Sequence, residues 1–351
     1  MWHGVCRIKE RVTGMSATQK PEVVVITGAS AGVGRATVQA FAKRGAHIGL
    51  IARGGPGMDG LEGAKRDVEA AGGKALMLPC DVADAAQVEA AAAKMEEEFG
   101  PIDIWVNVAM VSVFSPFKEM TAEEFKRTTD VTYLGQVYGT MSALKRMIPR
   151  DRGSIVVVGS ALAYRSIPLQ SAYCGAKSGI RGFIDSVRCE MIHDKSNIRI
   201  CMVQMPALNT PQFSWVKSRL PNNPQPVPPI FDPEVAAEAI YFAAHHKRRE
   251  LYVGFPTIKA VVGNMFIPGL IDVYLAKTGY KAQQTDQPKS PDRKDNLWDA
   301  LPGDHGADGT FGSRSRMSSP ALWLMMNQHK IALAGAAALA AGVITAVRKA
   351  R

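Results

Sequence analysis

Two residues four positions apart, Tyr173 and Lys177, have the types and spacing for proton-transfer chemistry. They lie in a run of small residues, SAYCGAKSG, at positions 171–179. On a helix, residues at positions i and i+4 share a face. A tyrosine hydroxyl, with an ordinary pKa of about 10, is a poor acid or base at neutral pH, but a nearby ammonium group favours its ionised form. The pair therefore predicts general acid–base catalysis by Tyr173, with Lys177 lowering its pKa. Taken alone, the pair also fits an ordinary helix surface.

A hydroxyl group at Ser160 extends this candidate site to three residues. Ser160 ends the apolar stretch SIVVVGS (154–160), thirteen residues before Tyr173. Open parallel sheets place their functional groups at the carboxyl ends of strands. We therefore expect the Ser160 hydroxyl to bind the oxygen of a carbonyl or alcohol substrate beside the tyrosine.

A glycine-rich turn near the start of the chain predicts a dinucleotide site. The segment ITGASAGVGRA (26–36) joins an apolar run to a helical pattern, and its glycines are spaced as TGxxxGxG. Such a turn brings the backbone close to a diphosphate and directs N–H groups at its negative charge. The residues expected to contact the cofactor here are Thr27, Gly28, Ser30, Gly32, Val33 and Gly34.

The end of the second apolar run predicts which dinucleotide binds. A NAD site usually places Asp or Glu there, to accept a hydrogen bond from the ribose 2′-hydroxyl, whereas this run ends in Ala52 and Arg53. A guanidinium group can pair with a 2′-phosphate instead. The sequence therefore favours NADP(H) over NAD(H). The alternative interpretation is an exposed arginine at a strand end.

Seven short runs rich in Val, Ile and Leu alternate with helical patterns. Continuous apolar runs are typical of strands that are covered on both faces. The alternation predicts an α/β fold with one doubly wound parallel sheet of seven strands, in a catalytic domain over residues 21–257. The expected strands are 23–28, 46–53, 74–81, 102–108, 154–160, 199–204 and 250–254.

Residues 21–255 resemble a short-chain dehydrogenase/reductase. The resemblance rests on five segments that follow one another in the order of the family: TGASAGVG, CDVAD, VNVAM, VVVGS and YCGAK. The resemblance implies a Rossmann-type fold and hydride transfer between a nicotinamide ring and a carbonyl or alcohol. It makes Tyr173 the proton donor and acceptor and Ser160 the residue that orients the substrate oxygen. Lys177 would lower the tyrosine pKa and bind the nicotinamide ribose. Further cofactor contacts implied by the resemblance are Asp81 and Val82 beside the adenine, Asn107 in the fourth-strand motif, and Thr210.

The chain departs from the pattern of that family at several positions. The family sequence Asn-Asn-Ala-Gly is Asn107-Val108-Ala109-Met110 here. The asparagine that completes the catalytic tetrad of the family is replaced by Thr132, whose hydroxyl could hold the water of a proton relay. We therefore include Thr132 among the candidate catalytic residues.

The two ends of the chain differ from this pattern in composition. Residues 1–20 are interpreted as a disordered leader, 258–280 as an apolar helical extension and 281–320, rich in Pro, Gly, Ser, Asp and Lys, as a disordered linker. Residues 321–351 form a predicted Ala-rich helix, with an uncharged run of 17 residues at 331–347. A span needs about 20 apolar residues, so the helix is either a membrane-associated tail or a soluble helix.

A hydrophobic substrate is expected because residues 211–232 occupy the position of the substrate lid of the family and carry Phe213, Trp215 and Phe231. The alternative is ordinary loop packing. By analogy with the family, the helical regions 121–149 and 171–195 predict a homodimer or homotetramer.

Composition limits the remaining partners. The excess of basic residues lies largely at the chain ends, without a basic block containing aromatic residues, so no nucleic acid partner is expected. Five cysteines without a CxxC spacing indicate reduced thiols in a cytoplasmic protein and no metal site. Two alternatives to an enzyme are a non-catalytic dinucleotide-binding regulator and a tail-anchored scaffold.

Overall fold

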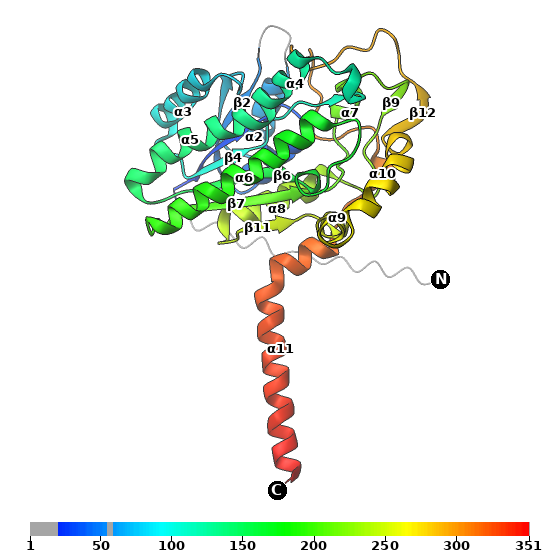
Figure 1. The fold of residues 1–351 in the computed structure, drawn as a ribbon. Helices are drawn as coiled ribbons and strands as arrows, with labels where there is room; N and C mark the ends of the chain where they lie inside the picture. Colours follow the sequence, from blue (N-terminus) through cyan, green and yellow to red (C-terminus); the bar gives the residue numbers. More distant parts are fainter. Residues whose placement is uncertain (1–19, 55–58, 351) are drawn as a thin grey trace, which may run out of the picture.

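Seven parallel strands form one sheet at the centre of the protein (Figure 1). The computed structural model describes residues 20–54 and 59–350; the leader expected over residues 1–20 lies outside this part except for Lys20. The strand order is β11-β7-β6-β4-β1-β2-β3, which confirms the predicted α/β fold. The strands are β1 (Val23–Thr27), β2 (His47–Ala52), β3 (Ala75–Pro79), β4 (Ile104–Asn107), β6 (Ser154–Ser160), β7 (Arg199–Met205) and β11 (Glu250–Tyr252).

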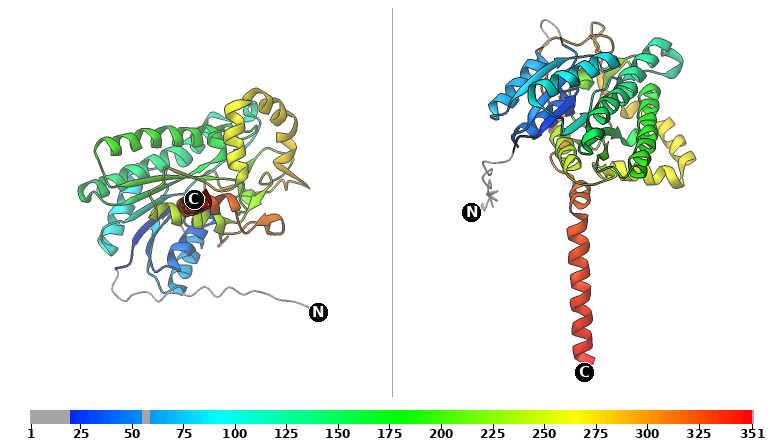
Figure 2. Two further views of the ribbon diagram at one scale, coloured as in Figure 1. Left: turned by 90° about the horizontal axis from the view of Figure 1, so that it is seen from below. Right: turned by 90° about the vertical axis from the view of Figure 1, so that its left-hand side faces the viewer.

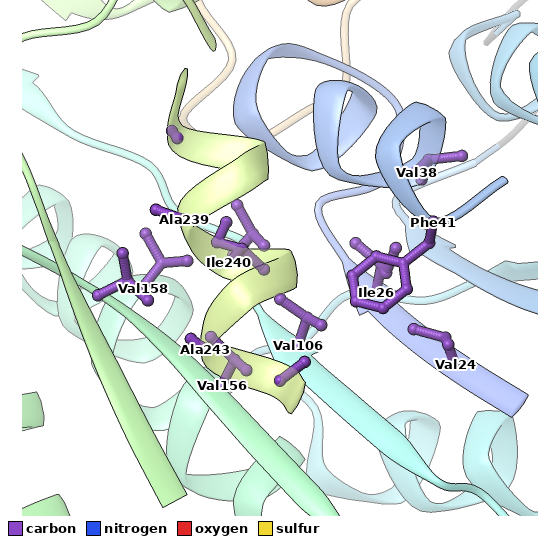
Figure 3. Close-up of a cluster of buried hydrophobic side chains, with 14 of the residues drawn as sticks. Val24, Ile26, Val38, Phe41, Val106, Val156, Val158, Ala239, Ile240 and Ala243 are labelled. Atoms are coloured by element: carbon purple, nitrogen blue, oxygen red, sulfur yellow. The ribbon is translucent and has the colours of Figure 1, made fainter. Parts of the chain in front are cut away.

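Helices cover both faces of this sheet, which explains the continuous apolar character of its strands. On one face pack α1 (Gly32–Ala42), α2 (Gly60–Ala70) and α8 (Pro233–His245). Figure 3 shows Phe41 of α1 and Ile240 of α8 among valines and isoleucines of β1, β4 and β6. The other face carries α3 (Ala85–Phe99), α5 (Gly135–Met147) and α6 (Ser171–His193).

The strand order changes direction between β1 and β4, which makes this point the topological switch of the sheet. β1 pairs with β2 on one side and with β4 on the other, all in parallel. In such sheets ligands bind at the carboxyl ends of the strands beside the switch. The fold therefore places the expected site next to the turn between β1 and α1.

Shorter elements connect the sheet to the surface. Between β4 and β6 the chain forms α4 (Ala122–Thr129), which begins with the capping box of Thr121 and Glu124, and continues through a π-helix (Asp130–Leu134) into α5. The remaining short elements of the catalytic domain are β5 (Val113–Phe114), α7 (Gln212–Trp215), β8 (Lys217–Ser218), β9 (Asn222–Pro224) and β10 (Ile230–Phe231), with 3-10 turns at Phe117–Glu119, Ile148–Arg150 and Ala161–Ala163.

After β11 the chain forms two helices and then a long segment that returns over the catalytic domain. The helices are α9 (Phe255–Phe266) and α10 (Pro268–Ala282). Residues 284–316, here called the strap, contain β12 (Gln284–Pro288), a 3-10 turn (Gly312–Arg314) and β13 (Ser315–Arg316). β12 pairs with β9 and β13 with β10.

The ordered strap corrects the expectation of a disordered linker over residues 281–320. Its composition contains few apolar residues, but its backbone and side chains find polar partners on the catalytic domain. The Lys289 N–H donates to Pro221 O (3.0 Å), the Asn296 N–H donates to Trp215 O (3.1 Å), and Leu297 is fully buried. Composition alone cannot reveal such partners, because they belong to a distant part of the sequence.

The C-terminal helix α11 (Pro320–Ala350) begins against the edge of the sheet and then leaves the body of the protein (Figures 1 and 2). Its first turn buries Ala321 and Leu322, and the Tyr252 N–H of the edge strand β11 contacts Met325 Sδ at 3.3 Å. A covered edge strand is protected against pairing with another chain. Among the residues that the structure describes, no helix is long and apolar enough to cross a membrane.

Candidate active site

A cavity of about 470 Å³ lies at the carboxyl ends of the strands, beside the topological switch. Its volume is within the range of roughly 300–1,000 Å³ that small-molecule and cofactor sites occupy. Twelve of the fifteen residues proposed from sequence line it: Gly28, Ser30, Gly32, Val33, Gly34, Arg53, Asp81, Val82, Ser160, Tyr173, Lys177 and Thr210. The topology thus brings residues that are far apart in sequence to one site.

The glycine-rich turn at one end of the cavity has the shape that a diphosphate requires. Gly28 has a φ of +70°, and a Cβ there would lie 2.9 Å from Ala109 Cα. A Cβ on Gly34 would lie 2.0 Å from Gly28 O, so only glycine allows α1 to start this close to the turn. The first turn of α1 lines the cavity, and its N-cap residue Ala31 provides no side-chain hydrogen bond. These features fit the phosphate groups of a dinucleotide.

Thr27 supports this turn without lining the cavity. Its Oγ1 accepts hydrogen bonds from Val108 N (2.9 Å) and Ala109 N (3.1 Å) and thereby ties the end of β1 to the end of β4. The expected cofactor contact of Thr27 is therefore corrected to a positioning role.

Ser160, Tyr173 and Lys177 line the same cavity as the glycine-rich turn. The hydroxyl groups of Tyr173 and Ser160 are hydrogen-bonded, and Ser160 Oγ also accepts from Leu162 N at 3.1 Å. Lys177 is almost fully buried; its Nζ donates to Val158 O at 2.7 Å and lies 5.6 Å from the centre of the Tyr173 ring. The i, i+4 spacing on α6 places both side chains at the end of β6, as the sequence indicated.

Burial dominates the electrostatics of this pair. It raises the pKa of Tyr173, while the hydrogen bond from Ser160 acts in the opposite direction. Burial also lowers the pKa of Lys177 to about 7, because the charged form loses its hydration. The net pKa change of the tyrosine is therefore opposite to the lowering expected from its lysine neighbour. Among the described residues the Lys177 ammonium group donates its hydrogen bond to the Val158 carbonyl and not to the Tyr173 hydroxyl.

Asn107 lies outside the cavity, in contrast to the expected cofactor contact. Its side chain is fully buried between β4 and α5. The Nδ2 group donates to Thr140 Oγ1 (3.1 Å), and Oδ1 accepts from Trp105 Nε1 (2.9 Å). Asn107 therefore positions the end of β4 against the helix, and the loop that follows carries the cavity-lining residues.

Thr132 is also turned away from the cavity, in the π-helix that precedes α5. Its hydroxyl donates to Val111 O (2.7 Å) and accepts from Val111 N (3.0 Å). Both hydrogen-bonding capacities are used within the protein, so the expected role of Thr132 in a proton relay is corrected to one of fixing the loop after β4.

Arg53 and Asp81 lie on the side of the cavity next to the glycine-rich turn. Arg53 donates through Nη1 to Trp298 O and through Nη2 to Asn296 O, both at 2.7 Å. Asp81 pairs with Arg127 Nη2 at 2.6 Å. Burial, followed by the charge of Arg127, lowers the pKa of Arg53, and the nearby carboxylates of Asp81 and Asp299 act in the opposite direction. This concentration of positive charge suits an anionic ligand.

The region of the cavity beyond Tyr173 is mainly apolar. Phe213 and Trp215 line it as expected, whereas Phe231 packs into the hydrophobic core and not into the cavity. Ser112 and Thr257 also border the cavity, but their hydroxyl oxygens are buried from solvent and have no hydrogen-bond partner among the described residues. The cavity can therefore hold a largely apolar molecule.

Residues of the strap form a part of the cavity wall that was not expected from sequence. They are Asn296, Ala300, Leu301, Gly303 and His305. The carbonyl groups of 296 and 298 contact Arg53, and every residue type carries a carbonyl, so no side-chain pattern announces this contact. Arg127 was missed for a different reason, because its partner Asp81 lies 46 positions earlier in the chain.

Comparison with known proteins agrees with this geometry. A family model described as short chain dehydrogenase matches residues 22–219. The chain belongs to this family. The match confirms the resemblance seen in the sequence and identifies the protein as an oxidoreductase of the NAD(P)-dependent dehydrogenase/reductase class, with residues 258–351 lying outside the match.

The share of a relative's length that this short-chain dehydrogenase matches differs from one relative to another. It is 32% identical to "Uncharacterized oxidoreductase YxnA" of Bacillus subtilis over 82% of this chain and 80% of the relative. It is 34% identical to a zebrafish (Danio rerio) 3-dehydrosphinganine reductase over 54% of this chain and 58% of the relative. It is 29% identical to a fatty acyl-CoA reductase of Acinetobacter baylyi over 64% of this chain and 73% of the relative.

Proposed function

We propose that this protein is an NADP(H)-dependent oxidoreductase that transfers hydride between the nicotinamide and the carbonyl or alcohol group of a hydrophobic substrate. One observation carries the proposal: Ser160, Tyr173 and Lys177 line the same cavity as the glycine-rich turn. A dinucleotide held at the turn and a carbonyl held at Ser160 would therefore share one enclosed space.

The residues of the chain have distinct roles in this reaction. When bound, the reduced nicotinamide supplies the hydride. The Ser160 hydroxyl donates a hydrogen bond to the substrate carbonyl and orients it. Tyr173, whose raised pKa keeps the phenol protonated at neutral pH, delivers its proton to the oxygen as the C–H bond forms. Lys177 stabilises the phenolate that remains, because an ammonium group favours the ionised form of a neighbouring phenol.

The preference for NADP(H) rests on the positive charge around Arg53. Of the five guanidinium N–H groups of Arg53, two donate to the carbonyls of Asn296 and Trp298. The other three have no acceptor among the described residues and can bind a 2′-phosphate. β2 ends without a carboxylate that would bind the 2′-hydroxyl of NAD(H). Arg127 adds a second cation beside Arg53.

The substrate proposed is a largely apolar carbonyl compound. Phe114, Phe213 and Trp215 provide apolar walls for it. Two relatives have names that specify reduction of 3-dehydrosphinganine and of a fatty acyl-CoA. These names guide the choice of substrates to test.

A turnover assay tests the proposal. The purified protein is mixed with NADPH and a panel of long-chain and aromatic ketones and aldehydes, and NADPH oxidation is recorded. Tyr173→Phe should reduce turnover by about 10²-fold or more, the scale of a lost general acid, while NADPH binding persists. Tyr138→Phe removes a hydroxyl that does not line the cavity and serves as the matched control.

Two outcomes would contradict an enzyme of this kind. Equal turnover of Tyr173→Phe and wild type would exclude Tyr173 as the proton donor. Cofactor binding without turnover of any substrate in the panel would favour the alternative of a dinucleotide-binding regulator.

The association state and location are further parts of the proposal. A homodimer or homotetramer through α5 and α6 is supported by the exposed apolar side chains of Met141 and Ile192. Light scattering on the purified protein tests this, and a monomeric mass would contradict it. The described cysteines are free thiols, which supports a cytoplasmic location.

The exposed apolar residues of α11, including Leu333, Leu339 and Ile344, support contact of this helix with a membrane surface. Flotation with vesicles tests it, using the full chain and a chain that ends at residue 328, which keeps the turns packed on β11. Equal recovery of both in the unbound fraction would contradict membrane contact.

A further inference from the structure

The strap is attached to the catalytic domain at the residues that surround the phosphate end of the cavity. Its first attachment is a row of three consecutive carbonyl groups. Asn296 O and Trp298 O accept from Arg53, and Leu297 O accepts from Arg127 Nε at 3.1 Å. Two buried or half-buried arginines are thus held by the strap backbone.

A second attachment lies eight residues further along, at residues 304–306. Asp304 pairs with Arg35 of α1 (Nη1 to Oδ1, 3.0 Å), whose side chain is almost fully buried. The Gly32 N–H, at the first position of α1, donates to Gly306 O at 2.9 Å. Helix N-terminal N–H groups are those that bind phosphates in dinucleotide sites, so the strap touches the glycine-rich turn itself.

The part of the strap between these attachments lies over the cavity without filling it. Ala300, Leu301, Gly303 and His305 line the same 470 Å³ space as the glycine-rich turn and Tyr173. The strap is therefore a wall of the site. A dinucleotide extended from the turn to Tyr173 would contact this wall. Three N–H groups of Arg53 have no acceptor among the described residues and can bind such a ligand while the other two hold the strap.

We propose that residues 296–306 of the strap close over the bound dinucleotide. The catalytic domain and the C-terminal extension then build the cofactor site together, and the strap must open for the cofactor to exchange. This inference rests on the proposed function. The attachments at 296–298 and 304–306 are polar, and the segment between them carries few buried side chains. Opening at residues 299–306 therefore breaks a small number of hydrogen bonds, while Leu297 stays in the hydrophobic core and anchors the strap.

The test weakens the second attachment from both sides. Asp304→Ala removes the partner of Arg35 on the strap, while Arg35 keeps Asp67 on α2 (2.7 Å). Gly63→Ala acts from the catalytic domain: its Cβ would lie 1.9 Å from Asp304 Oδ2, which forces the flexible carboxylate away. Alanine also favours the helix around residue 63 over glycine, so a loss of function in this variant cannot be ascribed to a weakened α2.

Stopped-flow fluorescence measures binding and release of NADPH, or of NADH if the wild type binds only that. Both variants should release the cofactor about tenfold faster than wild type and bind it more weakly. A tenfold change is expected when the closed conformation of the strap is destabilised by about 1.4 kcal/mol relative to the open one. Asp292→Ala changes an exposed strap residue that has no hydrogen-bond partner among the described residues. It is the matched control and should match wild type. Thermal unfolding confirms that each variant is folded.

Three results separate the inferences. Wild-type release rates in both variants would overturn the role of the strap, and slower release with tighter binding would show that the strap competes with the cofactor. Failure of the wild type to bind either reduced dinucleotide would contradict the proposed function itself. As a second measurement, hydrogen exchange of residues 296–309 should slow when NADPH is added, and faster exchange would contradict closure.

Discussion

The catalytic domain and the strap are stabilised by different kinds of interaction. The domain is organised by apolar side chains on the two faces of one sheet, as Figure 3 shows for one of these faces. Within the strap, all of whose residues the structure describes, the buried apolar side chains are Leu297 and Ala307. The strap is held mainly by carbonyl groups, Asp304 and short strand pairings. The apolar contacts of the domain are extensive and are lost together, whereas the separate polar contacts of the strap can break one by one. We therefore expect the domain to provide stability and the strap to provide mobility at the site.

The largest expected difference is in stability, between the catalytic domain and the C-terminal extension that includes the strap and the helices on either side of it. Phe41→Ala removes a fully buried ring between α1 and β1 and should lower the free energy of unfolding by about 3–5 kcal/mol. Phe266→Ala, in the extension, removes a ring that is 77% exposed and should change it by less than about 0.5 kcal/mol. Urea denaturation followed by circular dichroism measures both. Similar losses in the two variants would contradict the distinction.

A glycine substitution in the catalytic domain and one in the helix that follows the strap should have opposite effects. Gly34→Ala places a Cβ 2.0 Å from Gly28 O and should displace the glycine-rich turn, weakening NADPH binding by about tenfold or more and costing roughly 1–3 kcal/mol of stability. Gly335→Ala in α11 meets nothing within 4 Å and should stabilise that helix by roughly 0.5–1 kcal/mol. Calorimetry and NADPH titration measure the two effects. Unchanged NADPH affinity in Gly34→Ala would show that the turn does not hold the cofactor.

Arg53 connects the two regions, and its substitution sharpens the comparison. Arg53→Ala should weaken NADPH binding by about 10-fold or more, the scale of a lost charge-assisted pair, and weaken NADH binding less, because NADH has no 2′-phosphate. Fluorescence titration with both cofactors measures the ratio. Equal losses would mean that Arg53 serves only to hold the strap through Asn296 and Trp298.

The smallest effect is expected from an exposed ion pair of the catalytic domain. His245 Nε2 lies 3.0 Å from Glu22, and this contact raises the histidine pKa against the opposing effect of burial. Because the histidine pKa is higher in the folded state, the ion pair stabilises the protein fully at pH values below the unfolded-state pKa of about 6.5. This contribution is lost as the pH rises through the folded-state pKa. Glu22→Gln should therefore lower stability by less than about 1 kcal/mol at pH 5.5 and have no effect at pH 8.5. A loss that is larger at pH 8.5 would contradict this assignment.

Sequence patterns predicted the catalytic domain well because its determinants are local and repetitive. Strand β1 is fully buried and reads as an unbroken apolar run, and the glycine-rich turn follows it directly. Tyr173 and Lys177 were placed correctly because one helix fixes their spacing. The directions of their pKa changes were harder to predict, because burial depends on every element packed around them.

The errors occurred where a side chain has an alternative partner nearby or where the partner is far away in sequence. Thr132 and Asn107 satisfy their hydrogen bonds within neighbouring loops and helices, and so do not reach the cavity. The strap residues lie about 240 positions after Arg53, and they contact it through their backbone. No spacing rule connects such segments, and a composition rich in Pro and Asp indicated disorder instead.

The central claim is that Tyr173 protonates the same carbonyl group to which the cofactor delivers hydride. The most direct measurement uses NADPH carrying deuterium at C4 of the nicotinamide, with a ketone that the protein reduces. We expect one deuterium on the carbinol carbon of the alcohol in the wild type, and loss of product in Tyr173→Phe with binding of NADPH preserved. An alcohol whose carbinol hydrogen comes from solvent, or full product formation by Tyr173→Phe, would contradict the account.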